Sequence, residues 1–298
     1  MQTQEECYGC LDRLITTTVR LASADSGDRE KSLAAARAVL REGFSRNNIP
    51  TQIAAAAQRV IREICGDSDP FKEVKKREQT LASEAVIEAK RRLGDDWEGL
   101  FRLAALGNTV DFFRDLESVA EQMKNPVDFT VNQIPAFLER LKKAKLLLFL
   151  ADNAAECYFD LPLFRKLFTE VDEAVYVVKE RPVQNDLTIL DLTESGLKDQ
   201  FKRVETTGTD SPGIDLESAS SLFRELYDRA DLIVAKGMGY YETFSETGDN
   251  RVFYLLKAKC DPVALSIGVP KESFVSAFNS NHGGAAHADV AAQRKMKI

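Results

Sequence analysis

Four short apolar runs in the second half of this chain constrain its fold more than any other feature. They occupy residues 145–151, 174–178, 232–235 and 252–256, and longer polar or amphipathic stretches separate them. This alternation is typical of βα units built around a mainly parallel sheet. The runs therefore predict an α/β fold, with a three-layer α/β/α unit in which the sheet is mainly parallel.

The first part of the chain has the periodicity of helices. Apolar residues between Ile53 and Ile64 recur on one face of a 3.6-residue period, and Gly66 stands where that helix should end. Further helices are expected over 70–93 and 97–105, and few β-branched runs occur before residue 145. The predicted domains are 1–142, all-helical; 143–278, an α/β/α unit that binds metal and phosphate; and 279–298, a disordered tail.

Polar residues follow each of the four runs. They are Asp152 and Asn153, Asn185 and Asp186, Lys236, and Lys257 and Lys259. In an open α/β sheet, ligands bind beyond the carboxyl ends of the parallel strands. Hard divalent cations take oxygen ligands, and Asp152, Asn153 and Asp186 would fill three of roughly six coordination positions. The leading hypothesis is a metal-dependent site for a phosphorylated small molecule, in which the lysines offset phosphate charge.

Each of these residues also has a structural interpretation. Asp152 and Asn153 are good N-caps for a following helix, and Asp186 could anchor an Asx turn before Thr188. Lys236 and Lys257 could be ordinary lysines at strand ends. The coincidence of polar residues at four strand ends favours the functional interpretation.

Composition excludes several classes of protein. The net charge is −7, and this acidic balance argues against a nucleic-acid partner. No apolar run approaches the 18 or more residues of a membrane span, and the N-terminus lacks the features of a signal peptide. We expect a soluble protein of the cytoplasm, with no membrane partner. No P-loop sequence occurs, and both histidines, His282 and His287, lie in the expected tail.

The cysteines do not suggest a disulfide scaffold. The chain has five, an odd number at irregular spacing, and no export signal accompanies them. Only Cys7 and Cys10 form a CxxC pair, which is at most half of a structural zinc site. Two semi-buried thiols on an N-terminal helix are the simpler interpretation, and metal or redox chemistry is the alternative.

Several short motifs occur together along the chain. They are Cys7–Cys10, Asp69–Pro70 with Lys72, Gly107–Phe112, Leu150–Glu156, Asn185–Thr188, Gly208–Gly213, Lys236–Gly239 and Lys259–Cys260. Their order and approximate spacing resemble the damage-control phosphatase family, in its CxxC-containing branch found in archaea and bacteria. The resemblance covers about residues 5–272. Each motif alone is weak, but the combination is specific.

The resemblance implies a metal-dependent phosphatase that hydrolyses phosphomonoesters of small metabolites, such as sugar phosphates or damaged phosphorylated cofactors, by a metal-activated water. The implied metal is Mn²⁺, Co²⁺, Ni²⁺ or Mg²⁺, with Asp152, Asn153 and Asp186 at the family's ligand positions and the two aspartates as catalytic residues. The implied substrate-binding residues are Asn108, Asp111, Asn153, Lys236, Gly239, Tyr240, Glu242 and Lys259, of which Lys259 matches a phosphate contact.

Three residues depart from the family pattern. Ala155 replaces a glycine in the first motif, Pro162 lies where the next helix should continue, and Tyr240 stands where an asparagine is common. We expect that helix to kink or to start later, and we expect Tyr240 to affect substrate choice or activity. Two alternative functions stay open: an S-adenosylmethionine-dependent protein carboxyl methyltransferase, and a non-catalytic metal-dependent protein that binds phosphometabolites.

Overall fold

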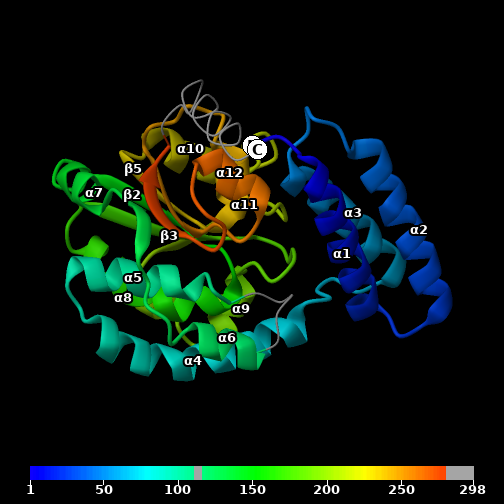
Figure 1. The fold of residues 1–298 in the computed structure, drawn as a ribbon, viewed down its shortest axis with the longest axis horizontal. Coiled ribbons are helices and arrows are strands. Elements are labelled where there is room, and N and C mark those ends of the chain that lie inside the picture. The colour runs from blue at the N-terminus through cyan, green and yellow to red at the C-terminus, as the bar shows by residue number, and fades with distance from the viewer. Residues whose placement is uncertain (111–115, 280–298) are drawn as a thin grey trace, which may run out of the picture.

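A seven-stranded, mainly parallel sheet forms the centre of the molecule (Figure 1), as a computed structural model describes it for residues 1–110 and 116–279. Its strand order is β1-β7-β6-β5-β2-β3-β4, and within the described residues only β6 and β7 pair antiparallel. The strands are β1 (Phe129–Asn132), β2 (Leu146–Leu150), β3 (Glu173–Val178), β4 (Val204–Thr206), β5 (Leu232–Lys236), β6 (Val252–Lys257) and β7 (Phe274–Phe278). The predicted α/β fold is confirmed, and the four apolar runs form β2, β3, β5 and β6.

Helices cover both faces of the sheet, which explains why β2, β5 and β6 are buried along their whole length. One face packs against α4 (Lys72–Leu93), α5 (Trp97–Gly107), α6 (Leu116–Gln122), α7 (Ile134–Leu141), α8 (Cys157–Phe168) and α9 (Ile189–Glu194). The other face packs against α10 (Ser221–Arg229), α11 (Gly237–Phe244) and α12 (Asp261–Ile267). Because side chains alternate along a strand, Leu147 and Phe149 belong to the first core and Leu148 to the second.

Three N-terminal helices stand apart with a core of their own. They are α1 (Glu5–Ala22), α2 (Ser26–Gly43) and α3 (Pro50–Cys65), and Figure 1 shows them side by side at one end of the molecule. The helix predicted from the Ile53–Ile64 periodicity is α3, and Gly66 ends it in a left-handed conformation with φ of 66°. We call α1–α3 the helical bundle.

The predicted boundary between residues 142 and 143 does not follow this packing. Helices α4 and α5 lie on the sheet rather than in the helical bundle, and strand β1 belongs to the sheet although only helices were expected before residue 143. At the other end, Asn279 of the expected tail is buried, and its side-chain amide donates to the carbonyl of Phe244 at 2.8 Å. Residues 280–298 lie outside the described part.

Charge-assisted hydrogen bonds fasten the helical bundle to the rest of the molecule. Arg59 and Arg62 of α3 both donate to the buried carboxylate of Asp210, each with a contact of 2.5 Å. Arg62 also donates to the carbonyl of Pro182 at 2.8 Å. Two arginines on one carboxylate make a strong and directional contact. It ties α3 to the two loops that follow β3 and β4.

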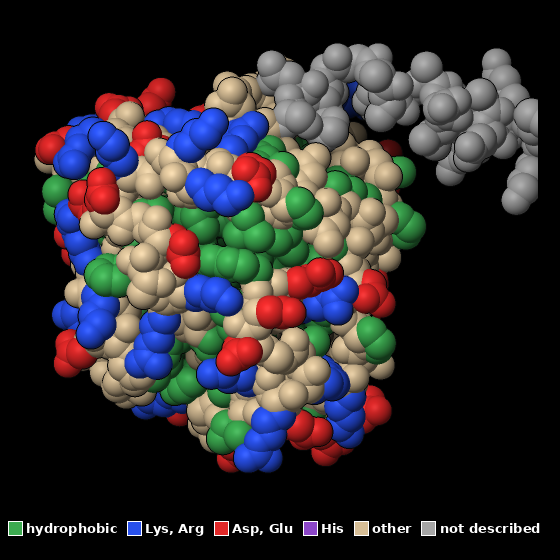
Figure 2. Space-filling model, turned by 90° about the vertical axis from the view of Figure 1, so that its left-hand side faces the viewer, with side chains coloured by type: hydrophobic (Ala, Val, Ile, Leu, Met, Phe, Trp, Pro, Cys, Tyr) green, Lys and Arg blue, Asp and Glu red, His purple; other side chains and the backbone are tan. Residues whose placement is uncertain are grey.

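The opposite end of the molecule carries an ordinary mixed surface. Figure 2 shows acidic and basic side chains interspersed there around exposed apolar groups, without a large area of one sign. In the described part of the chain, no helix combines the length and apolar character that crossing a bilayer requires.

Phe137 should be one of the residues on which the stability of the first core depends. The centroid of its buried ring lies 5.2 Å from the ring centroid of Phe101 on α5 and 4.7 Å from that of Phe253 on β6. We expect Phe137→Ala to lower the free energy of unfolding by about 3–5 kcal/mol, as measured by urea denaturation. Glu139→Ala on the exposed side of the same helix should change it by less than about 0.5 kcal/mol. Equal effects would contradict this assignment.

Candidate active site

The loops after β2 and β3 bring Asp152 and Asp186 together. The two strands are parallel neighbours, so their carboxyl ends meet at one edge of the sheet. Beyond that edge, Asn153 and Asp186 form an isolated antiparallel bridge, and the backbone N–H of Leu187 donates to the carbonyl of Asp152 at 2.8 Å. These backbone contacts fix the distance between the two aspartates before any ligand binds.

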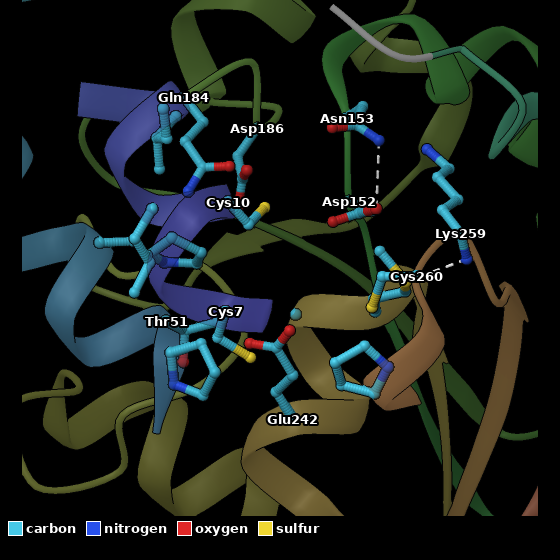
Figure 3. A pocket seen from close by; sticks show the side chains of 18 of the residues that line it. Cys7, Cys10, Thr51, Asp152, Asn153, Gln184, Asp186, Glu242, Lys259 and Cys260 are labelled. Atoms are coloured by element: carbon cyan, nitrogen blue, oxygen red, sulfur yellow. Dashed lines mark hydrogen bonds between the residues drawn. The ribbon is translucent and has the colours of Figure 1, made fainter. Parts of the chain in front are cut away.

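A cavity of ≈ 340 Å³ lies between this edge of the sheet and the helical bundle. Seven of the predicted site residues line it: Asn108, Asp152, Asn153, Asp186, Gly239, Glu242 and Lys259. Lys236 and Tyr240 are fully buried and do not line it, and Asp111 lies outside the described residues. Figure 3 shows Asp152, Asn153 and Lys259 on one side of the cavity, with Cys7 and Cys10 of α1 facing it from the helical bundle.

Two amide side chains hold Asp152 in place. Asn108 and Asn153 each donate from Nδ2 to Asp152 Oδ2 at 3.1 Å and to Glu156 Oε1 at 2.8 Å. Asn153 makes no capping bond to the 3₁₀ turn that follows it, Ala154–Glu156, so the capping interpretation is wrong for this residue. Because Nδ2 of Asn153 is engaged in these hydrogen bonds, the side-chain oxygen Oδ1 is the atom left to bind a ligand. The turn also accommodates Ala155, which departs from the family pattern.

Lys236 lies behind the cavity wall, in a buried ion cluster with α8. Its ammonium group donates to Glu156 at 2.5 Å, to Asp160 at 2.6 Å and to the carbonyl of Ala104 at 2.9 Å. Burial opposes the charge on all three side chains, but the mutual attraction raises the pKa of Lys236 and lowers that of Glu156. Burial raises the pKa of Asp160 to about 6, although Lys236 opposes the shift. Lys236 therefore does not reach the cavity, where it was expected to contact the substrate. It is not an ordinary strand-end lysine either, because its ammonium group is buried in the ion cluster.

The acidic residues of this cluster, Glu156 and Asp160, were not predicted as part of the site. Their spacing of four residues, which places side chains on one face of a helix, was the available signal.

Pro162 lies inside α8, which begins at Cys157. Of the two outcomes expected at this proline, the later start of the helix does not occur.

Asp186 carries an oxygen that is buried without a hydrogen bond. Burial raises the pKa of Asp186 to about 6, although Lys179 opposes the shift. Its Oδ2 has no hydrogen-bond partner within the described residues, and the nearest ammonium, that of Lys179, is 3.7 Å away. An Asx turn before Thr188 is not formed, because the N–H of Thr188 bonds Asp191 instead.

Asp152 is in a still less favourable environment for a negative charge. Burial and the neighbouring charges of Glu156 and Asp186 raise its pKa well above the usual range, and Lys259 and Lys236 offset only part of this. Two carboxylates that disfavour ionisation together are a common feature of functional sites. A bound cation would reverse this by stabilising both as anions.

Gly237 and Gly239, at the start of α11, allow two close approaches of the backbone. Gly237 has φ of 77°, and a Cβ atom there would lie 1.9 Å from Asp152 Oδ2. Gly239 lies against Gly213, whose own Cβ would be 2.2 Å from the Gly239 carbonyl oxygen. Both glycines therefore serve the packing of the site, and neither belongs to a loop that cradles a nucleotide.

Three thiols and a further carboxyl group also line the cavity. Cys7, Cys10 and Cys260 line it together with Glu242 (Figure 3). Burial raises the pKa of Glu242 to about 7 and that of the Cys260 thiol to about 12. None of the three forms a disulfide within the described residues, and their arrangement there assigns them no chemical role.

The donor set at the sheet edge fits a hard divalent cation. Asp152 and Asp186 supply carboxylate oxygens and Asn153 an amide oxygen, the donors that such ions prefer. Within residues 1–110 and 116–279, there is no group of three or more His, Cys, Asp or Glu side chains that could hold a metal ion by itself. A metal site here would therefore depend on the amide, on water and on substrate oxygen to complete the coordination.

Replacing Gly237 should disturb Asp152 directly. Gly237→Ala places a methyl group on the Asp152 carboxylate and strains the backbone, whereas Gly268→Ala, at φ of 83° with no atom within 4 Å, only strains it. The strain should lower the free energy of unfolding by about 1–2 kcal/mol in both variants. The clash should cost Gly237→Ala about 1–3 kcal/mol more, as measured by urea denaturation. Equal losses would show that Asp152 moves away freely.

Comparison with known proteins identifies the family. The model of the ARMT1-like damage-control phosphatase domain matches residues 3–275. A damage-control phosphatase of Pyrococcus horikoshii is 34% identical over 285 residues, covering 94% of this chain and 99% of that protein. One from Archaeoglobus fulgidus is 29% identical, covering 90% of this chain and 96% of that protein.

A solved structure agrees with the sequence comparisons. The crystal structure of a DUF89 family protein from Pyrococcus horikoshii superimposes with a TM-score of 0.85 at 32% identity, covering 94% of this chain and 100% of that one. The resemblance inferred from the motifs is thus confirmed, and the chain belongs to the ARMT1-like damage-control phosphatase family.

Proposed function

We propose that this protein is a divalent-metal-dependent phosphatase that hydrolyses phosphomonoesters of small metabolites in the cytoplasm. The observation that carries the proposal is the pair of aspartates beside Lys259, half-buried Asp152 and buried Asp186, of which Asp186 has an oxygen without a hydrogen-bond partner in the described part of the chain. Asp152, Asn153 and Asp186 would hold the cation, which is Mn²⁺, Co²⁺, Ni²⁺ or Mg²⁺. The names of the related phosphatases support the reaction class.

A bound divalent cation supplies Lewis acidity, which polarises a phosphoryl oxygen and makes a nearby water more acidic. The protein supplies position and charge. Asp152, fixed by Asn108 and Asn153, and Asp186 would orient the attacking water and accept its proton. Lys259 would offset the negative charge on the phosphoryl oxygens. Uncatalysed phosphomonoester hydrolysis is so slow that enhancements reach about 10²¹-fold, so positioning and charge must supply nearly all of the effect.

The size of the cavity limits the substrate. A volume of ≈ 340 Å³ is near the lower end for ligand sites, so the substrate is a compact molecule such as a sugar phosphate or a small phosphorylated cofactor fragment. Glu242 and Thr51 lie near Cys7, away from Asp152. They offer polar contacts to the part of the substrate that does not react.

No observation favours the methyltransferase alternative. Its cofactor needs a glycine-rich turn that is open to a nucleoside. Here Asp152 occupies the space beside Gly237, and Gly213 occupies the space beside Gly239. The binding-protein alternative predicts retention of a phosphometabolite without release of phosphate. The two experiments below distinguish it from a phosphatase.

Asp186→Asn should abolish turnover without unfolding the protein, because asparagine keeps the shape of the side chain and removes its charge. We expect phosphate release to fall by at least about 10²-fold. The assay measures inorganic phosphate from a panel of sugar and cofactor phosphates, with each of the four cations or with EDTA. EDTA should have the same effect on the unmodified protein, and re-addition of metal should reverse it.

Asp228→Asn, on an exposed face of α10, is the matched control and should keep full activity. Full activity of Asp186→Asn would show that the proposed metal site is wrong. Tight binding of the phosphate esters by the unmodified protein, with no release of phosphate under any metal, would show that it is a binding protein.

Lys259→Met should weaken the binding of substrate more than the binding of metal. Its side chain lines the cavity and donates to the carbonyl of Val110 at 3.2 Å, so it is held near Asp152 rather than extended into solvent. We expect KM for the best phosphomonoester to rise about tenfold or more, while the metal concentration that gives half-maximal activity stays within about twofold. An unchanged KM would exclude Lys259 as the phosphate contact.

A further inference from the structure

Lys179, the last residue before the loop that carries Asp186, is a buried ammonium group to which the proposed mechanism gives no task. Its side chain is fully buried. Its Nζ donates to the carbonyl of Gly213 at 2.5 Å and to the hydroxyl of Tyr240 at 3.1 Å. It lies 3.7 Å from Asp186 Oδ2, which is close enough for attraction between charges and too far for a hydrogen bond.

The position of this ammonium explains why Asp186 Oδ2 is left without a bond. A lysine has three N–H groups, and here two of them donate to the Gly213 carbonyl and the Tyr240 hydroxyl rather than to Asp186. Lys179 therefore balances the charge of Asp186 without occupying the lone pairs of Oδ2. A carboxylate that was fully bonded to an ammonium would have to break that bond before it could bind a cation.

Both acceptors that hold Lys179 lie directly behind the wall of the cavity, each next in the chain to a lining residue, Pro212 or Gly239. The Gly213 carbonyl is fixed because Gly213 packs against Gly239 with no room for a side chain. Tyr240 follows Gly239 on α11, and its ring centroid lies 4.5 Å from the Lys179 Nζ. The ring also stacks on Phe244, with centroids 6.2 Å apart, so a phenylalanine would pack in the same place and would lack only the hydroxyl.

We propose that Tyr240 is a positioning residue that acts through Lys179: its hydroxyl holds the ammonium away from Asp186 and so keeps Oδ2 available to a divalent cation. This inference depends on the proposed function, because it assumes that Asp186 binds the cation. It gives a role to the tyrosine that departs from the family pattern. That role is to set metal affinity, without contact with the substrate.

The test is the affinity of the metal-free protein for Mn²⁺, measured by titration calorimetry in the absence of substrate. In Tyr240→Phe the ammonium loses one acceptor and turns toward Asp186, so Mn²⁺ affinity should fall about tenfold. Lys179→Met removes the positive charge beside the site, so affinity should rise by about tenfold. In the double variant there is no ammonium to reposition, so Tyr240→Phe should have no further effect.

Tyr241→Phe is the matched control. It removes the same atom one residue along the helix, where the hydroxyl pairs with Ser266 at 2.8 Å, and Mn²⁺ affinity should not change. If Lys179→Met does not fold, the comparison of Tyr240→Phe with Tyr241→Phe decides alone.

The outcomes separate the two proposals. If the unmodified protein binds Mn²⁺ and Tyr240→Phe binds it equally well, the role of Tyr240 is refuted while the phosphatase proposal stands. A loss of affinity that Tyr240→Phe causes equally with and without Lys179 would mean that the hydroxyl acts by packing, which also refutes it. If the unmodified protein binds no divalent cation, the proposed function itself is wrong.

Discussion

The buried ammonium group of Lys236 is the contact on which the arrangement of the site depends. It joins β5 to Asp160 of α8 and to Glu156 of the turn before that helix. Removing one partner from such a cluster leaves a buried charge uncompensated, at a cost of about 3–5 kcal/mol. The same Glu156 also accepts hydrogen bonds from Asn153. Asn153 in turn holds Asp152. The position of the candidate catalytic carboxylate is thus determined by an ion cluster that never touches the cavity.

Around this cluster, buried carboxylates outnumber buried ammonium groups. Asp152 has two acidic neighbours, and two of the lysines nearby are engaged elsewhere: Lys236 with Glu156 and Asp160, and Lys179 with Gly213 and Tyr240. The excess of negative charge is concentrated on Asp152 and Asp186, at the one place where the cavity gives a ligand access. Without a cation, burial favours the protonated form of these two carboxyl groups, as their raised pKa values indicate. A divalent cation would stabilise both as anions.

Much of the fold could be predicted from the sequence, because apolar runs of four to seven residues are long enough for buried strands and too short for helices. Strand β1 was missed because it is a four-residue edge strand, half-buried in alternation, and carries no such run. The positions of Asp152 and Asp186 also followed from the strand ends. The roles of Lys236 and Tyr240 did not, because a sequence does not show whether a side chain at a strand end turns toward solvent or back into the core.

The attachment of the helical bundle has a consequence for how the cavity exchanges its contents. Nine of the 24 residues that line the cavity belong to the helical bundle, which has its own core. The chain joins the bundle to the rest of the molecule near residue 66, and the arginine contacts to Asp210 reinforce this link. The amino group of Met1, which donates to Glu242 and Ser245, and the hydrogen bond between Gln58 and Gln184 do so as well. A hinge motion of the chain near residue 66 would move the helical bundle away from the sheet and open the cavity, while the core of the bundle and the cores on the sheet stay intact. One of the contacts that resist this motion is the ion pair of Arg59 with Asp210, and because the Arg59 side chain is 47% exposed, dissolved salt would weaken that pair. Product release would then respond to ionic strength through a surface remote from the reacting atoms.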